Sequence, residues 1–113
     1  ELETFLGLKG RSDLIVFING RDQKKTFTWI AEFSGSGGNF KILIESLLNS
    51  LREELLTLKG VLEKDRELPE LKISEITTLI KLLMEAYQNL RYSPIDSLPL
   101  EIALTEFYND ESR

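Results

Sequence analysis

Charged side chains are concentrated in one short stretch of the sequence, from Val61 to Lys72. Between these two residues, four acids and two bases surround Pro69. The residues are Glu63, Lys64, Asp65, Arg66, Glu67 and Glu70. Four acids so close together raise the question of a metal site. An EF-hand loop, however, needs acids at alternating positions around a central glycine, and this stretch lacks that spacing. We therefore predict no metal site here, and read the mixed charges as a solvated linker between helices.

A glycine-rich run, SGSGGN at positions 34–39, invites comparison with a phosphate-binding loop. Such a loop follows a strand and ends in Lys followed by Ser or Thr, whose side chains reach the phosphates and Mg²⁺. Here Lys41 is followed by Ile42, and we expect no strand before the run. The glycines are better explained by a tight turn with positive φ, so we predict no bound cofactor.

Acid–base catalysis has few candidate residues in this chain. Histidine and cysteine are both absent, which removes the commonest general base, the commonest metal ligand and any thiol nucleophile. A small hydrolase or nucleotide-binding enzyme would need converging carboxylates such as Glu45, Glu53 or Glu85. An inward carboxylate costs several kcal/mol unless it is paired, and the helical phase turns all three outward. We predict no catalytic residues and no enzyme activity for this chain.

The element around which the others are expected to pack runs from Ser74 to Arg91. Its apolar residues recur in steps of three and four, the period of a helix with one buried face. They are Ile76, Leu79, Ile80, Leu83, Met84, Tyr87 and Leu90. Ser74 is expected to cap the first turn, and Pro94 lies just beyond the end.

A second strong helix is predicted from Phe40 to about Leu58, with Gly60 as its stop. Its polar side is expected to carry Arg52, Glu53 and Glu54. Its apolar stripe is Phe40, Leu43, Ile44, Leu47, Leu48, Leu51, Leu55 and Leu58.

Three weaker helices complete the prediction. One runs from Asp22, a candidate cap, to Phe33. Another starts near Leu98–Pro99 and continues to Tyr108. The polar tail after it, at residues 109–113, should fray. Residues 14–18, LIVFI, suit a strand as well as a helix because three of the five are β-branched. No second strand lies nearby to pair with it, so we favour a short buried helix, capped near Ser12–Asp13 and stopped near Asn19–Gly20.

Composition fits one helical domain. The chain has 113 residues and a net charge of −5, which disfavours binding to a nucleic-acid backbone. The only basic doublet, Lys24–Lys25, is expected on a solvated helix face. No apolar run approaches the ~20 residues of a membrane helix, and the first residue, Glu1, suggests a piece of a longer protein. We predict an all-α, five-helix bundle spanning residues 1–113.

The order of these landmarks resembles the third, helical collar domain of the bacterial DNA polymerase III clamp-loader gamma/tau subunit. The match is carried by Phe5–Leu8, Asp13–Ile18, Gly37–Gly38, Leu47–Leu56 with Arg52 at the family's arginine, Ile73–Leu90, Tyr92–Pro94 and Leu100–Leu104. The chain departs from the family's pattern in LIVFI and in its short charged linker. The family's ATP-binding loop, zinc site and arginine finger belong to domains outside this sequence.

The resemblance implies an oligomerisation module of a cytoplasmic replication protein, whose collar holds the ATPase modules of five subunits together. Its partners would be other clamp-loader subunits, in homo- and hetero-oligomers, without direct nucleic-acid binding by this domain and without a membrane. An unrelated helical adaptor domain remains the alternative.

An oligomerisation module should expose apolar or aromatic residues that lie off its core stripes. Four residues meet that description in the predicted helices and in the turn after Arg91: Trp29, Tyr92, Ile102 and Tyr108. For Trp29, a half-buried position against a neighbouring helix is the competing interpretation.

Overall fold

The computed structural model describes residues 8–111, and within them the chain is helical. The α-helices are α2 (Leu8–Asn19), α3 (Gln23–Gly35), α4 (Phe40–Leu58), α5 (Ile73–Asn89) and α6 (Leu98–Glu111), and a 3₁₀ turn, η1 (Leu90–Tyr92), follows α5. The expected five-helix, all-α fold is therefore confirmed for this part of the chain. Residues 1–7, which include the Phe5–Gly7 part of the resemblance, and the last two residues of the predicted tail lie outside the described residues.

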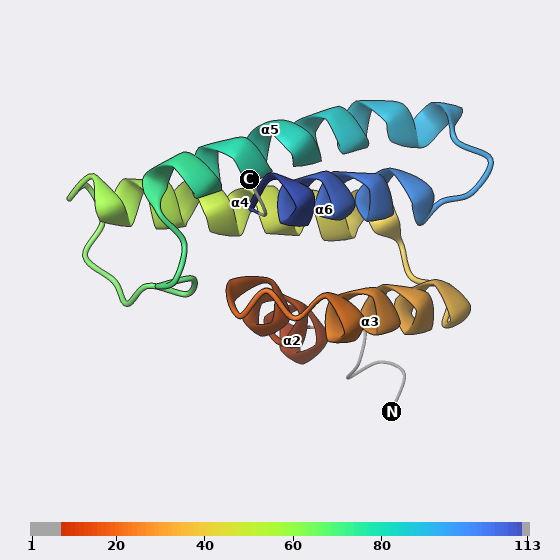
Figure 1. Cartoon of the computed structure of the whole chain (residues 1–113), viewed down its shortest axis with the longest axis horizontal. Helices are drawn as coiled ribbons and strands as arrows, with labels where there is room; N and C mark the ends of the chain where they lie inside the picture. Colours follow the sequence, from red (N-terminus) through yellow and green to blue (C-terminus); the bar gives the residue numbers. More distant parts are fainter. Residues whose placement is uncertain (1–7, 112–113) are drawn as a thin grey trace.

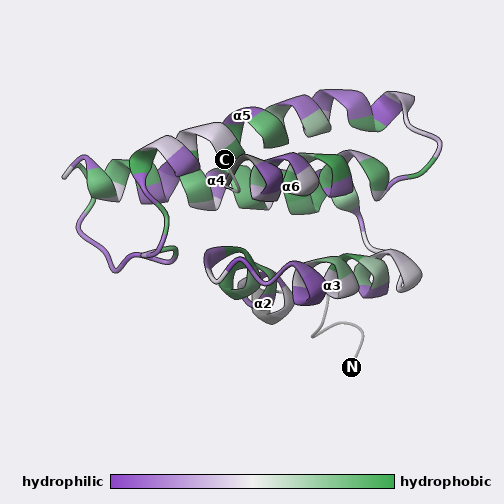
Figure 2. Ribbon diagram, viewed as in Figure 1, coloured by the Kyte–Doolittle hydropathy of each residue, from purple (hydrophilic) through white to green (hydrophobic). Residues whose placement is uncertain are grey.

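The helices form two layers (Figure 1). The long helices α4 and α5 and the shorter α6 run lengthwise together, with α5 packed against both of the others. Helices α2 and α3 form the second layer, in which α2 contacts α4 and α3 contacts α6. Figure 2 shows hydrophobic residues in bands along the helices, whereas the segment between α4 and α5 is mostly hydrophilic. Stripes of this kind are buried only when the helices pack against one another.

The ambiguous LIVFI run is helical, as favoured from the sequence. It lies in α2, where Leu14, Ile15 and Ile18 are buried and Val16 is exposed. The predicted cap at Ser12–Asp13 is wrong, because both residues lie inside α2, which already includes Leu8. The stop near Asn19–Gly20 is confirmed, although the residue with positive φ just beyond it is Arg21 (φ 55°).

The turn between α3 and α4 explains the glycine-rich run. Gly37 has φ 78°, a left-handed conformation that glycine adopts without strain. A Cβ on Gly38 would lie only 2.4 Å from the ring of Phe33, so the backbone can approach that ring only without a side chain. Asn39 then caps α4 by accepting a hydrogen bond from the Ile42 N–H, as Asp22 caps α3 through the Lys25 N–H.

Helix α5 begins one residue before the predicted cap. Its first turn is closed by Glu75, whose carboxylate accepts a hydrogen bond from the Lys72 N–H, and Ser74 is not the cap. Leu83 and the other stripe residues Ile76 and Leu79 are buried, but Met84 is exposed. The helix gives way to η1 at Leu90, before the turn that contains Pro94.

The prediction of a solvated linker from Val61 to Lys72 is correct for most of its charged residues, because only Arg66 among the six is not exposed, but it misses how the stretch is attached. Leu68 and Leu71 are buried in the core, and Glu54 on α4, predicted to be outward, is 3% exposed. The Glu54 carboxylate accepts hydrogen bonds from the Arg66 side chain and from the N–H groups of Glu67 and Leu68. The Arg66 guanidinium also donates to the carbonyls of Leu68 and Leu71, at 2.8 Å in each case. We call this arrangement the Glu54 clasp, because it ties the segment back onto α4.

Helix α6 starts at Leu98 with Pro99 in its first turn, as predicted. It extends further than expected, to Glu111, so residues 109–111 of the predicted fraying tail are helical.

Candidate interaction surface

Trp29, predicted to be exposed at an interface, is instead part of the core. It is 4% exposed, and its ring stacks on Phe33 with the centroids 5.0 Å apart. Phe33 in turn meets Phe40 edge to face. The prediction failed because it assumed a single buried stripe on α3, whereas α3 packs against both α2 and α6 and buries a wider arc.

Tyr108, the second predicted interface residue, is also buried, at 3% exposed. Its hydroxyl lies 2.8 Å from the Thr26 hydroxyl, which itself donates to the Asp22 carbonyl. Because the Thr26 proton is used in that bond, the Tyr108 hydroxyl is the donor between the two. Burial raises the pKa of Tyr108. Tyr108 therefore joins α6 to α3 inside the domain.

Tyr92 and Ile102 are exposed as predicted, at 76% and 49%. Both line one groove between α5 and α6, together with the exposed Leu98. The structure thus brings together two of the four predicted residues and moves the other two into the core.

The groove has a volume of about 300 Å³ and is open to solvent. Its lining residues are Leu82, Glu85, Ala86, Asn89, Tyr92, Ser93, Leu98, Pro99, Ile102, Ala103 and Glu106. Spacings of three and four place them on facing sides of the two helices. Three of them, Ala86, Pro99 and Ala103, are small and buried, so no large side chain fills the space between the helices.

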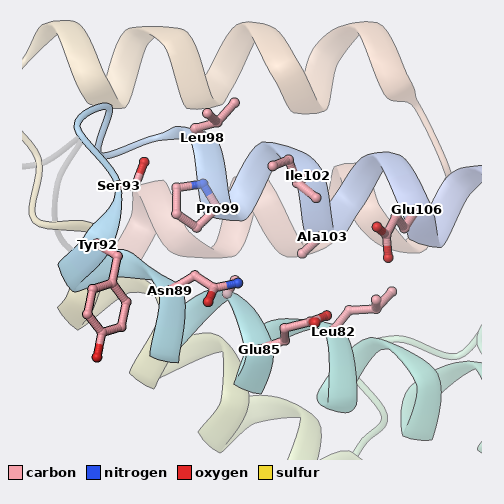
Figure 3. Close-up of a pocket in the computed structure, with 11 residues that line it drawn as sticks. Leu82, Glu85, Asn89, Tyr92, Ser93, Leu98, Pro99, Ile102, Ala103 and Glu106 are labelled. Carbon is pink, nitrogen blue, oxygen red and sulfur yellow. The ribbon is translucent and has the colours of Figure 1, made fainter.

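Figure 3 shows how the remaining side chains lie. Glu85 on α5 and Glu106 on α6 lie on opposite sides of the groove, and Tyr92 lies at its end beside Asn89. Leu98 and Ile102 come from the first two turns of α6. The surface therefore combines exposed apolar groups with two carboxylates.

Leu98 and Glu106 were not singled out as surface residues from the sequence, and Glu85 was considered only as a carboxylate for catalysis. The sequence contained a partial indication, because Leu98 and Ile102 are four residues apart on a helix whose core stripe is Leu100, Ala103, Leu104 and Phe107. Glu85 had been placed outward, which is correct, but its position opposite Glu106 depends on how α5 and α6 pack.

The carboxylates considered for catalysis point away from the core. Glu45 and Glu85 are exposed, and Glu45 accepts a hydrogen bond from the Tyr87 hydroxyl, which raises the pKa of Tyr87. Glu53 pairs with Lys64 at 2.6 Å, and this hydrogen bond lowers the pKa of Glu53. Within residues 8–111, no group of three or more acidic side chains is arranged to hold a metal ion. No helix in that same range is both long enough and apolar enough to cross a membrane.

Comparison of the chain with protein-family models, with curated proteins and with solved structures found no match. The interpretation of the groove therefore rests on its own geometry and on the sequence resemblance described above.

Proposed function

We propose that this chain is a collar-type oligomerisation domain, of the kind found in the gamma/tau subunit of the bacterial DNA polymerase III clamp loader. The observation that supports the proposal best is the groove between α5 and α6, where Tyr92, Leu98 and Ile102 are all exposed. The resemblance of the sequence to the helical collar domain adds the identity of the partners.

The energetics of this surface favour association. Burying one large apolar side chain that was in water gains about 1.5–3 kcal/mol. Three such side chains around one groove form an exposed apolar patch, and aromatic residues such as Tyr92 are enriched in the centres of interfaces. Burial of this patch against a partner subunit would recover that free energy.

The rest of the domain supplies a rigid platform for the groove. Helices α5 and α6 pack against each other directly, and α6 is tied to α3 through Tyr108 and Thr26. A surface held by such packing needs little ordering when a partner binds, which lowers the entropic cost of association. In this proposal the domain places subunits relative to one another, and the chemistry of the assembly is carried out elsewhere.

Size-exclusion chromatography tests the proposal. The chain is mixed with the other clamp-loader subunits of the same organism, and each component is also run alone. We expect the chain to elute earlier in the mixture, together with those subunits. Elution at the position of the chain alone would contradict the clamp-loader assignment and favour an unrelated helical adaptor.

A further inference from the structure

The charges around the groove indicate which partner would fit it. Its lining includes Glu85 and Glu106 on opposite walls, and among the described residues that line it there is no Lys or Arg. Arg91 lies beside the end of the groove, with its guanidinium carbon 5.6 Å from the centroid of the Tyr92 ring. The lining is therefore acidic, and Arg91 adds a basic group beside its Tyr92 end.

A second copy of the chain docking through the same face fits these charges poorly. In a two-fold symmetric contact the same patch meets itself, so Glu85 and Glu106 would approach other carboxylates. Like charges brought together at an interface cost binding free energy. The occupant that the walls favour has the opposite charge.

The shape of the groove indicates a helix. Its lining on α5 and η1 runs from Leu82 to Tyr92, which at 1.5 Å per residue corresponds to about 15 Å, or nearly three helical turns. The small residues of its floor, Ala86, Pro99 and Ala103, leave room for inserted side chains. An amphipathic helix binds such a groove by inserting apolar residues spaced three or four apart.

We propose that the groove between α5 and α6 binds an amphipathic helix of a partner protein. Apolar anchors of that helix meet Leu98 and Ile102, and its Lys or Arg residues face Glu85 and Glu106. This inference deepens the proposed function and rests on it, because it names the chemistry of the segment through which a partner subunit attaches. The basic residues of the partner lie away from Tyr92, where Arg91 would repel them.

A second hollow of the described surface does not select a partner in the same way. It has a volume of about 520 Å³ and lies between α2 and α3, with Asp13 and Glu32 as well as Lys24 and Lys25 in its lining. Because the two signs balance there, its charges favour neither a basic nor an acidic segment.

A titration with synthetic peptides tests the inference. The probe is an amphipathic Leu–Lys peptide of about 14 residues, or four helical turns, and its control is the same peptide with Glu in place of Lys. Backbone amide chemical shifts of the whole chain are followed by NMR. We expect the Leu–Lys peptide to shift the amides of the groove residues and to bind at least about tenfold more tightly than the Leu–Glu peptide.

Matched variants separate binding in the groove from general attraction to an acidic protein. Ile102→Ser is expected to weaken peptide binding about tenfold or more. Val61→Ser, at an even more exposed apolar position beyond the end of α4, is expected to leave it unchanged. The double variant Glu85→Gln, Glu106→Gln removes two charges from the groove. Its matched control, Glu63→Gln, Glu70→Gln, removes two charges from the α4–α5 segment. We expect the groove variant to weaken binding of the Leu–Lys peptide at least about threefold more than the control does.

Two results would overturn the inference: equal binding of the two peptides, or equal effects of the groove variants and their controls. Neither result depends on clamp-loader subunits. Peptide binding in the groove without co-elution would refute the proposed function alone, and co-elution without peptide binding would refute this inference alone.

Discussion

Two tyrosines show that the elements packed around a residue decide whether it is buried. Tyr92 and Tyr108 have the same side chain, yet the first is exposed and the second is enclosed by α3 and α6. Only the enclosed hydroxyl must find a partner inside the protein, because an unpaired buried donor loses its hydrogen bond with water. Tyr108 is therefore a stability residue, and Tyr92 is a surface residue.

We expect Tyr108→Phe to lower the free energy of unfolding by about 1 kcal/mol, because the buried hydrogen bond to Thr26 is lost. The matched control Tyr92→Phe should leave stability unchanged, since its hydroxyl is at the surface. Urea denaturation of both variants measures the difference. Equal stability of the two variants would mean that the Tyr108 hydroxyl does not hold α6 to α3.

Leu83 tests the assignment of the core face of α5. Leu83→Ala should lower the free energy of unfolding by about 2–5 kcal/mol, because a fully buried side chain is removed and a cavity remains. Its neighbour Met84 is 51% exposed, so Met84→Ala is the control and should change stability little. A loss below about 0.5 kcal/mol for Leu83→Ala in chemical denaturation would contradict the packing described here.

At the scale of the elements, the segment between α4 and α5 is held by polar contacts as well as by Leu68 and Leu71. Glu54 is nearly inaccessible to water, and it accepts hydrogen bonds from Arg66 and from two backbone N–H groups. A buried carboxylate is tolerated only when its oxygens are satisfied in this way. The clasp therefore fastens a largely exposed, highly charged segment to α4, while Leu68 and Leu71 are its residues in the core.

We expect Glu54→Gln to destabilise the domain by about 3 kcal/mol, because Arg66 loses its ion-pair partner in a partly buried site. The amides of Glu67 and Leu68 should also exchange faster with deuterium. The control is Glu53→Gln, which breaks the solvent-exposed Glu53–Lys64 pair and should hardly move the denaturation midpoint. If both variants behave alike, the clasp does not hold the segment.

The ion pair between Arg21 and Glu75 links the α2–α3 turn to the start of α5 and predicts a pH dependence. Burial raises the pKa of Glu75, but the hydrogen bonds from the Lys72 N–H and the Arg21 guanidinium outweigh burial, so the pKa of this carboxyl lies below its ordinary value. A carboxyl whose folded pKa is depressed stabilises the fold above its unfolded pKa, and this stability is lost as the pH falls through the folded pKa.

Stability of the unmodified chain should therefore fall more steeply than that of Glu75→Gln as the pH is lowered from about 6 to 3. Thermal melts of the two proteins across this range provide the test. A difference in melting temperature that stays constant with pH would contradict a role for the charged form of Glu75.

At the scale of the whole molecule, the helical periodicity of the sequence was enough to predict the fold class and the two long helices. It was not enough to predict which polar or aromatic residues are enclosed. Trp29, Glu54 and Tyr108 are buried by contacts with residues on other elements, and the position of those elements is not contained in the phase of one helix. Ile102 was correctly expected at the surface because only one side of α6 carries its apolar stripe.

The groove illustrates the same limit. Tyr92 and Ile102 were each expected at the surface, but their meeting around one hollow with Leu98, Glu85 and Glu106 follows from the packing of α5 against α6. A candidate surface could thus be predicted residue by residue, whereas its shape and charge required the assembled fold.

The proposed function depends most directly on the association of subunits through this groove. Sedimentation velocity of the reconstituted assembly tests it with Ile102→Asp, with Val61→Asp as the control at an exposed position in another part of the chain. Circular dichroism first verifies that both variants fold. Because an anchor at an interface contributes about 2 kcal/mol or more, we predict that Ile102→Asp weakens association about thirtyfold or more, while Val61→Asp assembles like the unmodified chain. Normal assembly of a folded Ile102→Asp variant would contradict the account.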